Sequence, residues 1–241
     1  MHRMLMESAL GEGDGIQPEL RLDYKLTDVD FETGRITFAN GTEGHHDAVV
    51  AADGVAVCTV PCAPVSRWIE ADSHCSPVHS PGKDGHCGRQ ETLHFNMSAC
   101  KCGQEASPSS WIHQEYPFWA NGLCSLMGDA AHPMMPDQSQ GACQAIEDAA
   151  ALGLAFSKAH FRGDVQMAVQ IFEKVRKPRA TKVQSASARA RLNITERIGF
   201  SSNTSNSKYS VPAEKDKLTI DEMNTYDIKA HVAEVYKANG L

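Results

Sequence analysis

The stretch that most constrains this fold is LMGDAAHPMMPDQSQGACQAIEDAAALGLAF, at residues 126–156. A short apolar run ends at Met127, and Gly-Asp follows it directly. Pro133 and Pro136 stiffen the next segment and cannot continue a strand. An alanine-rich segment with the composition of a helix begins near Gln140. This order predicts a strand, a rigid loop and a helix whose start lies close to the end of the strand.

The residue types at this junction suit a ligand held between the strand end and the helix start. Gly128 has no side chain, so the backbone can approach a bulky group. Asp129 offers a carboxylate that accepts hydrogen bonds from hydroxyl groups. The free amides at Gln140, Gly141 and Ala142 carry partial positive charge, which suits an anion or an electron-rich carbonyl. An ordinary strand, turn and capped helix is the alternative interpretation of the same residues.

The N-terminal part of the chain predicts a helix followed by strands. Residues 1–10 have apolar side chains at helical spacing. Residues 20–39 alternate between apolar and polar around a turn at 32–34, which predicts a β-hairpin. NGTEG at 40–44 predicts a second turn. DAVVAADG at 47–54 predicts a strand that is apolar on both faces, as an internal strand would be.

The C-terminal half predicts mainly helix. A short strand at 123–127 follows a turn at Asn121-Gly122. Helices are expected at 140–160, at 164–192 with a kink at Pro178, and at 220–237, with a loop at 201–208. Residues 58–110 contain six of the eight cysteines and show little periodicity. The whole pattern predicts an α/β fold.

Composition excludes several classes of protein. The formal net charge of −7 gives no reason to expect nucleic acid as a partner. No apolar run approaches the roughly 18 residues that a membrane span needs, and the N-terminus lacks the pattern of a signal peptide. We therefore expect an intracellular, cytoplasmic protein whose cysteines are reduced thiols. The sequence leaves the oligomeric state open.

Residues 128–153, GDAAHPMMPDQSQGACQAIEDAAALG, closely resemble the Gly-Asp motif of FAD-dependent aromatic-ring monooxygenases, the salicylate-hydroxylase-like group common in fungi. The resemblance implies that Asp129 binds the ribityl chain of the flavin. It also implies that the loop with Pro133 and Pro136 lies along the isoalloxazine ring, and that the helix start faces the pyrimidine edge of that ring. The candidate FAD-binding residues in this motif are Gly128, Asp129, Pro136, Gln140, Gly141 and Ala142.

Two segments nearer the N-terminus resemble the family less closely. DAVVAADGV at 47–55 is similar to the family's Asp-Gly motif, which adds Asp53 and Gly54 to the candidate FAD-binding residues. The Ser and Arg that usually follow this motif are replaced here by the run VAVCTV at 55–60. Residues 2–10, HRMLMESAL, resemble the helix that follows a cofactor-binding Arg in the family.

The sequence contains no GxGxxG unit, the glycine-rich turn that brings a helix start to the pyrophosphate of a dinucleotide. We therefore expect an incomplete FAD/NAD(P)-binding monooxygenase fold with a shortened substrate-binding sheet, as in a truncated family member or a gene-model fragment. Its expected parts are an FAD-domain remnant at 1–57, an irregular substrate-domain remnant at 58–118, the Gly-Asp motif with FAD-binding helices at 119–200, and a C-terminal loop and helix at 201–241. Such a chain should bind FAD weakly or not at all by itself.

The expected activity follows from the resemblance. Intact relatives hydroxylate a phenolic or aromatic substrate with NAD(P)H and O₂, so a small aromatic molecule is the expected substrate. No residue stands out as a catalytic base, and a loop-stiffening or hydrogen-bonding role is the better interpretation of His132. The sequence leaves open whether this chain turns over.

Two alternative functions remain open at this stage. Cys58, Cys62, His74 and His79 have the spacing C-x3-C-x11-H-x4-H, close to that of a two-Cys, two-His zinc site. The other alternative is a non-catalytic remnant that acts through an exposed sheet edge and exposed apolar surface.

Overall fold

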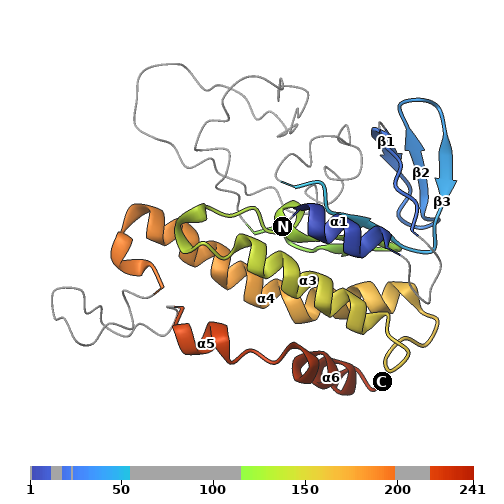
Figure 1. The fold of residues 1–241 in the computed structure, drawn as a ribbon. Helices are drawn as coiled ribbons and strands as arrows, with labels where there is room; N and C mark the ends of the chain where they lie inside the picture. Colours follow the sequence, from blue (N-terminus) through green and yellow to red (C-terminus); the bar gives the residue numbers. More distant parts are fainter. Residues whose placement is uncertain (1, 12–17, 23, 55–114, 199–217) are drawn as a thin grey trace, which may run out of the picture.

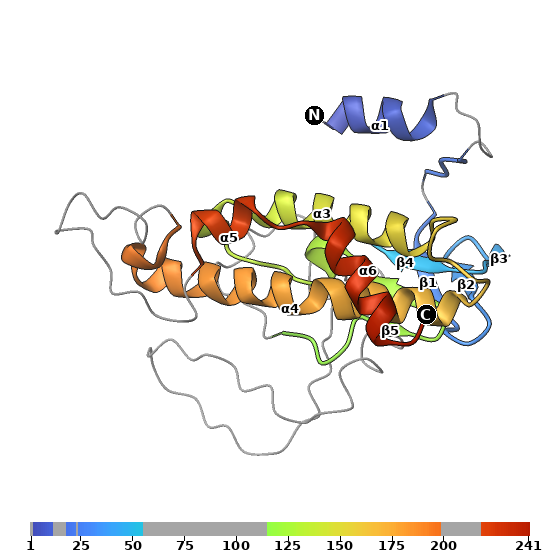
Figure 2. The same cartoon turned by 90° about the horizontal axis from the view of Figure 1, so that it is seen from below.

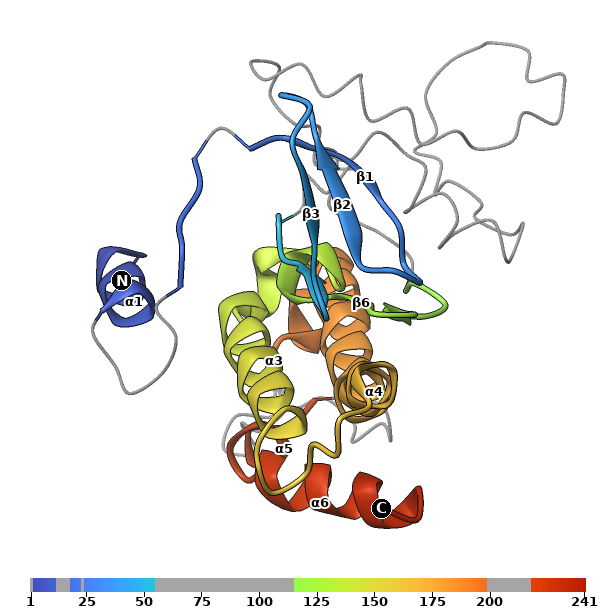
Figure 3. The same cartoon turned by 90° about the vertical axis from the view of Figure 1, so that its right-hand side faces the viewer.

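The computed structural model describes residues 2–11, 18–22, 24–54, 115–198 and 218–241. It has a mixed α/β fold, as the sequence predicted. Figure 1 shows the strands above the long helices α3 (Gly141–Ala155) and α4 (Val165–Leu192), with α5 (Ile220–Asn224) and α6 (Ile228–Ala238) below them. The end-on view in Figure 3 shows the same three layers. Within the described ranges, no helix is long and apolar enough to cross a membrane.

The first sheet is a small antiparallel meander. Its strands β1 (Leu26–Val29), β2 (Arg35–Phe38) and β3 (Glu43–His45) pair in that order, which confirms the predicted hairpin. The predicted turn at 40–44 is too long, because Glu43 already pairs with Thr37 in the sheet. Gly41 has a φ of +80° and lets the chain reverse within fewer residues.

The second sheet contains the strand that leads into the Gly-Asp motif. Its order is β4 (Val49–Ala51), β6 (Cys124–Leu126) and β5 (Ala120–Asn121). β5 and β6 form an antiparallel hairpin, whereas β4 and β6 run parallel. β4 was predicted to be internal, but among the described strands it lies at the sheet edge, where Val50 is 38% exposed. An apolar composition indicates burial potential but does not decide how many neighbours a strand has.

The helices agree with the prediction in position and differ at their ends. Helix α1 (His2–Leu10) forms as expected but lies apart from the helix pair in Figure 2, with Met4 and Leu5 exposed. Helix α3 ends at Ala155, five residues earlier than predicted, and Phe156 caps it. Helix α4 runs unbroken through Pro178.

The predicted C-terminal helix is two helices in the structure. The side chain of Asp227 accepts hydrogen bonds from the backbone amides of Lys229 and Ala230. A side chain that caps amides in this way starts a new helix, so the chain breaks between α5 and α6.

The main core joins the sheets to the helices. Trp119, at the start of β5, is 1% exposed and lies beside Phe172 of α4. Tyr236 of α6 donates a hydrogen bond from its hydroxyl to the carbonyl oxygen of Ala155 at the end of α3. The buried members of this core are Phe31, Trp119, Cys124, Leu126, Ala131, Ala151, Ile171, Phe172, Val175, Ala180, Val232 and Tyr236. The proposed four-part division of the chain stays a prediction, because the boundaries at 57/58 and 200/201 fall outside the described residues.

Gly34 and Gly41 give a matched test of the hairpin geometry. Both have positive φ, +67° and +80°, but a Cβ at Gly34 would lie 1.9 Å from the backbone oxygen of His46, whereas Gly41 has no described atom within 4 Å. We expect Gly34→Ala to lower the free energy of unfolding by about 3 kcal/mol and Gly41→Ala by about 1 kcal/mol. Urea unfolding of both variants measures the difference. Equal losses would contradict the close contact.

Candidate functional site

The two Asp-containing turns lie at the same edge of the second sheet. β4 and β6 are parallel, with Val49 opposite Cys124 and Ala51 opposite Leu126. The amide of Met127 also donates to the carbonyl oxygen of Ala51 at 2.9 Å. The carboxyl ends of parallel strands meet at one edge, which is where ligands bind in open α/β sheets. Residues 53–54 and 128–129 therefore leave the sheet on the same side.

The turn after β6 brings the carboxylate of Asp129 to the start of α3. Gly128 has a φ of +62°, and a Cβ there would lie 3.5 Å from the Cβ of Ala145. Asp129 is solvent-exposed. Its Oδ1 lies 3.8 Å from the position that a Cβ on Gly141 would occupy. A side chain at Gly141 would therefore enter the space beside this carboxylate.

The N-terminus of α3 is open. Gln140 is the N-cap residue but makes no side-chain capping bond, and the first turn contains no acidic residue. The first hydrogen bond of the helix runs from the amide of Gln144 to the carbonyl oxygen of Gln140 at 2.9 Å. The amides of Gly141 and Ala142 precede that bond and point out of the helix end. The positive end of the helix dipole therefore lies next to Asp129.

Two buried glutamines hold the proline loop on α4. Gln184 donates to the carbonyl oxygen of Pro133 at 2.8 Å. Gln138 donates to the carbonyl oxygens of Ala186 and Glu196 at 3.2 and 3.0 Å, and its own Oε1 accepts from the amide of Ile198 at 2.7 Å. This support fixes the loop, which leaves Pro136 exposed on it.

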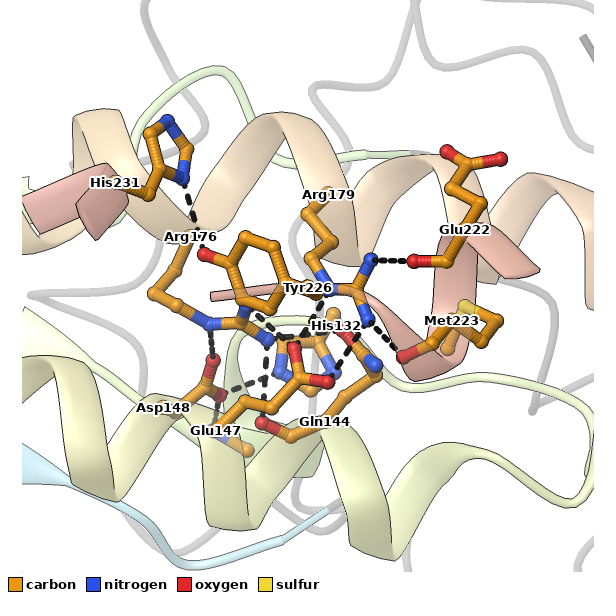
Figure 4. Close-up of polar contacts among 11 residues, drawn as sticks. His132, Gln144, Glu147, Asp148, Arg176, Arg179, Glu222, Met223, Tyr226 and His231 are labelled. Carbon is orange, nitrogen blue, oxygen red and sulfur yellow. Dashed lines mark hydrogen bonds and ion pairs between the residues drawn. The ribbon is translucent and has the colours of Figure 1, made fainter. Parts of the chain in front are cut away.

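The turn itself is anchored by a buried carboxylate, Asp148, in the middle of α3 (Figure 4). Its Oδ2 accepts from the amide of Gly128 at 2.9 Å and lies 2.6 Å from Nε2 of His132. Its Oδ1 accepts from Nε of Arg176 on α4 at 2.8 Å. Asp148, His132 and Arg176 are all 0% exposed. One carboxylate therefore ties the turn after β6 to both long helices.

The electrostatics of Asp148 favour its charged form. Burial raises the pKa of this carboxyl, but the hydrogen bond with His132 and the charge of Arg176 outweigh burial and hold the pKa below its ordinary value. His132 contacts Asp148 through Nε2, and its ring packs beside that of Trp119, with the ring centroids 5.3 Å apart. This contact agrees with the hydrogen-bonding role that the sequence favoured for His132, which stays a prediction.

A second carboxylate, Glu147, joins this cluster on the outer side. Its Oε2 lies 2.7 Å from Nη1 of Arg176 and 2.7 Å from Nε of Arg179. Gln144 accepts from Nη2 of Arg176 at 2.8 Å through its side-chain oxygen. The cluster thus pairs two arginines of α4 with two neighbouring carboxylates of α3.

The structure brings most of the predicted site residues to one place. Gly128, Asp129 and Gly141 are neighbours, Gln140 and Ala142 flank them on the helix start, and Asp53 and Gly54 follow the adjacent parallel strand. The possible zinc ligands Cys58, Cys62, His74 and His79 lie outside the described residues. Within the described part of the chain, no group of three or more His, Cys, Asp or Glu residues could hold a metal ion.

Sequence reasoning did not find the residues that support the site. Asp148, Arg176, Gln138 and Gln184 were treated as ordinary helix and loop residues. A signal was available, because Gln144 and Asp148 fall on the same helical face as the small apolar residues Ala151 and Ala155. Polar residues on a buried face require partners.

Asp148 gives a test of this support. Its lowered pKa means that it stabilises the fold above the unfolded-state pKa of about 4, and that this stability is lost as the pH falls through the folded-state pKa. We expect Asp148→Asn to lower the free energy of unfolding by about 3 kcal/mol at pH 7, because Arg176 and His132 lose a buried partner. The loss should shrink as the pH falls below about 4 and through the lowered folded-state pKa, by about the stability that the wild-type carboxylate gives up there.

Urea unfolding at several pH values measures both effects. Asp227→Asn is the control, since this exposed residue caps α6 and asparagine caps a helix as well as aspartate does. If Asp148→Asn were as stable as the control at pH 7, the carboxylate would not anchor the turn.

Part of this chain is similar to known FAD-dependent proteins. Residues 113–187 match the FAD binding domain family. The fungal FAD-dependent monooxygenase phomE of Diaporthe leptostromiformis is 46% identical over 68 residues, which is 28% of this chain and 18% of the relative. The 6-hydroxynicotinate 3-monooxygenase of Bordetella bronchiseptica is 42% identical over 88 residues, 34% of this chain and 23% of the relative.

A solved salicylate hydroxylase–substrate complex shares the fold. It covers 88% of this chain and 70% of its own chain, with a TM-score of 0.53 and 21% identity. The chain spans about a fifth of the length of the curated relatives it matches, 18% and 23% for the two above. These findings confirm the resemblance carried by the Gly-Asp motif. Residues 113–187 therefore form an FAD binding domain, in a part of the chain that is similar to FAD-dependent monooxygenases.

Proposed function

We propose that this chain binds the isoalloxazine ring and ribityl chain of a flavin between the turn at 128–129 and the start of α3. The observation that carries the proposal is the position of Asp129. Its exposed carboxylate lies beside Gly141, 3.8 Å from where a Cβ would be, at an uncapped helix start. A carboxylate for hydroxyl groups thus adjoins amides for a carbonyl, in a space that a glycine keeps open.

The donor and acceptor chemistry fits a flavin. The carboxylate of Asp129 accepts hydrogen bonds from ribityl hydroxyls. The amides of Gly141 and Ala142 would donate to a pyrimidine carbonyl of the ring and would stabilise negative charge there. Bound flavin supplies redox chemistry, with NAD(P)H as the reductant and O₂ as the oxidant in the proposed reaction. The names of relatives such as 6-hydroxynicotinate 3-monooxygenase support hydroxylation of a small aromatic substrate.

The proposal is limited to the flavin end of FAD. These 241 residues contain no GxGxxG turn for the pyrophosphate. The adenylate half should therefore add little to the affinity of the chain, which binds through the ribityl chain and ring alone.

A flavin titration tests this specificity. We expect the purified chain to bind FAD and riboflavin with dissociation constants within about threefold of each other, a difference of under 1 kcal/mol. Flavin fluorescence during titration measures both constants. Stoichiometric yellow FAD retained through purification, or FAD bound more than about 100-fold tighter than riboflavin, would mean that these residues hold the adenylate. Failure to bind either flavin would contradict the proposed function.

The role of Asp129 has its own test. We expect Asp129→Ala to weaken riboflavin binding about 10- to 100-fold, because hydrogen bonds to a charged acceptor contribute about 1.5–3 kcal/mol. Asp164→Asn is the matched control. Asp164 is an exposed aspartate that caps α4 at the far end of the helix pair, and asparagine preserves that cap. Equal affinities for the two variants would remove Asp129 from the binding site.

A further inference from the structure

The buried cluster behind the turn continues to the C-terminal segment of the chain. Arg179 holds Glu147 with two hydrogen bonds, from Nε to Oε2 at 2.7 Å and from Nη2 to Oε1 at 2.9 Å. The same Oε2 lies 2.7 Å from Nη1 of Arg176, the arginine that binds Asp148. Figure 4 shows this sequence of contacts between α3 and α4. Glu147 is thus shared between the arginine behind the turn and the arginine further out.

The guanidinium of Arg179 also contacts the C-terminal segment, residues 218–241. Its Nη1 and Nη2 donate to the carbonyl oxygens of Glu222 and Met223 at 3.3 and 3.4 Å, near the end of α5. Its guanidinium lies over the ring of Tyr226, 4.0 Å from the centroid. The hydroxyl of Tyr226 lies 3.0 Å from Nδ1 of His231 on α6. Arg179 therefore contacts α3, the segment between α5 and α6, and the end of α5 at once.

Arg179 supplies one of the two guanidinium charges that face the two carboxylates of this cluster. Asp148 and Arg176 are 0% exposed, Arg179 is 10% exposed and Glu147 is 22% exposed at their side chains. Two carboxylates face two guanidinium groups in this enclosed space. Without Arg179, Arg176 alone would neutralise both carboxylates, and an unpaired charge in a mostly buried position is costly. Arg176 already contacts Glu147 through Nη1 and Asp148 through Nε, so the loss of Arg179 would draw Arg176 toward Glu147 and away from Asp148.

We propose that Arg179 is a positioning residue for the flavin-binding turn. It neutralises Glu147, which leaves Arg176 aligned on Asp148, and Asp148 in turn holds the amide of Gly128 and the ring of His132. The described contacts alone link Arg179 to the turn. The effect of Arg179 on flavin binding rests on the proposed function. The C-terminal segment takes part because Arg179 is held in place by the carbonyls of α5 and the ring of Tyr226.

The test compares three variants with the wild-type chain. Arg179→Met removes the charge and keeps most of the side-chain length. Lys182→Met is the matched control, since Lys182 lies one turn further along α4 and binds Glu222 at 2.7 Å rather than Glu147. The double variant Arg179→Met/Glu147→Gln removes one charge of each sign, so that Arg176 and Asp148 remain a balanced pair.

The first measurement needs no flavin. Amide hydrogen exchange of Gly128, followed by NMR, reports how firmly Asp148 holds the turn. We expect exchange at Gly128 to become about tenfold faster in Arg179→Met, which corresponds to about 1.4 kcal/mol. We expect the control to match the wild type. The double variant should return Gly128 to near the wild-type rate while the amides of α5 still exchange faster, because the C-terminal segment has lost its arginine.

The second measurement is riboflavin affinity, which should follow the exchange rate of Gly128 across the same variants. If Arg179→Met fails to fold, Arg179→Lys carries the test, because lysine keeps the charge but cannot bond both oxygens of Glu147 and stack on Tyr226. It should give a smaller increase in the exchange rate at Gly128.

Three outcomes would overturn the proposal. One is an exchange rate at Gly128 in Arg179→Met that equals the wild-type rate. If Arg179→Lys has to be used instead, the same result in that variant counts equally. Another is an equal increase in Lys182→Met, which would assign the effect to general loosening of the C-terminal segment. The last is a double variant no better than Arg179→Met, since a purely structural arginine is not rescued by removal of its partner charge. Absence of flavin binding in the wild type would instead defeat the proposed function and leave the exchange result to decide this inference.

Discussion

The structure around the candidate site depends on one buried carboxylate. Asp148 accepts hydrogen bonds from the backbone of the turn after β6 and from a side chain of α4, and it pairs with His132 of the loop. These three partners come from different elements, so their relative positions are fixed by a single group in the core. A carboxylate without these partners would be too costly to bury. The same contacts that stabilise Asp148 therefore give the turn its geometry.

This anchoring explains how an exposed residue can have a defined position. Asp129 is solvent-exposed, yet the residue before it is held through its amide by Asp148. The start of α3 belongs to the same helix as Asp148, so the carboxylate of Asp129 and the amides of α3 share one rigid support. Residues that position a ligand work best when packing and hydrogen bonds behind them fix their geometry. The proposed flavin contacts meet that condition, because Asp148 supports both the turn that carries Asp129 and the helix whose start lies beside it.

The similarity to FAD-dependent monooxygenases is carried by a limited part of the chain. The family match covers residues 113–187, which contains the second sheet's hairpin, the turn, α3 and most of α4. The buried cluster at Asp148 and Arg176 lies wholly within this range, whereas its outer contacts reach α5 and Tyr226 beyond it. The C-terminal segment thus meets the family domain at Arg179.

The sequence by itself determined the local elements and the chemistry of the motif. Glycine and proline punctuation placed the turn at 128–129, the loop and the start of α3, because these residues restrict the backbone regardless of context. The tertiary structure decided what the sequence could not. Among the described strands, it placed β4 at the edge of its sheet. It also divided the last helix at Asp227, and brought Asp148, Arg176 and Glu147 together across two helices. Those pairings join residues at least 28 positions apart, so no local pattern encodes them. Only the packing of α3 against α4 makes them neighbours. Because that contact is buried, a charged side chain left without a partner there would be costly.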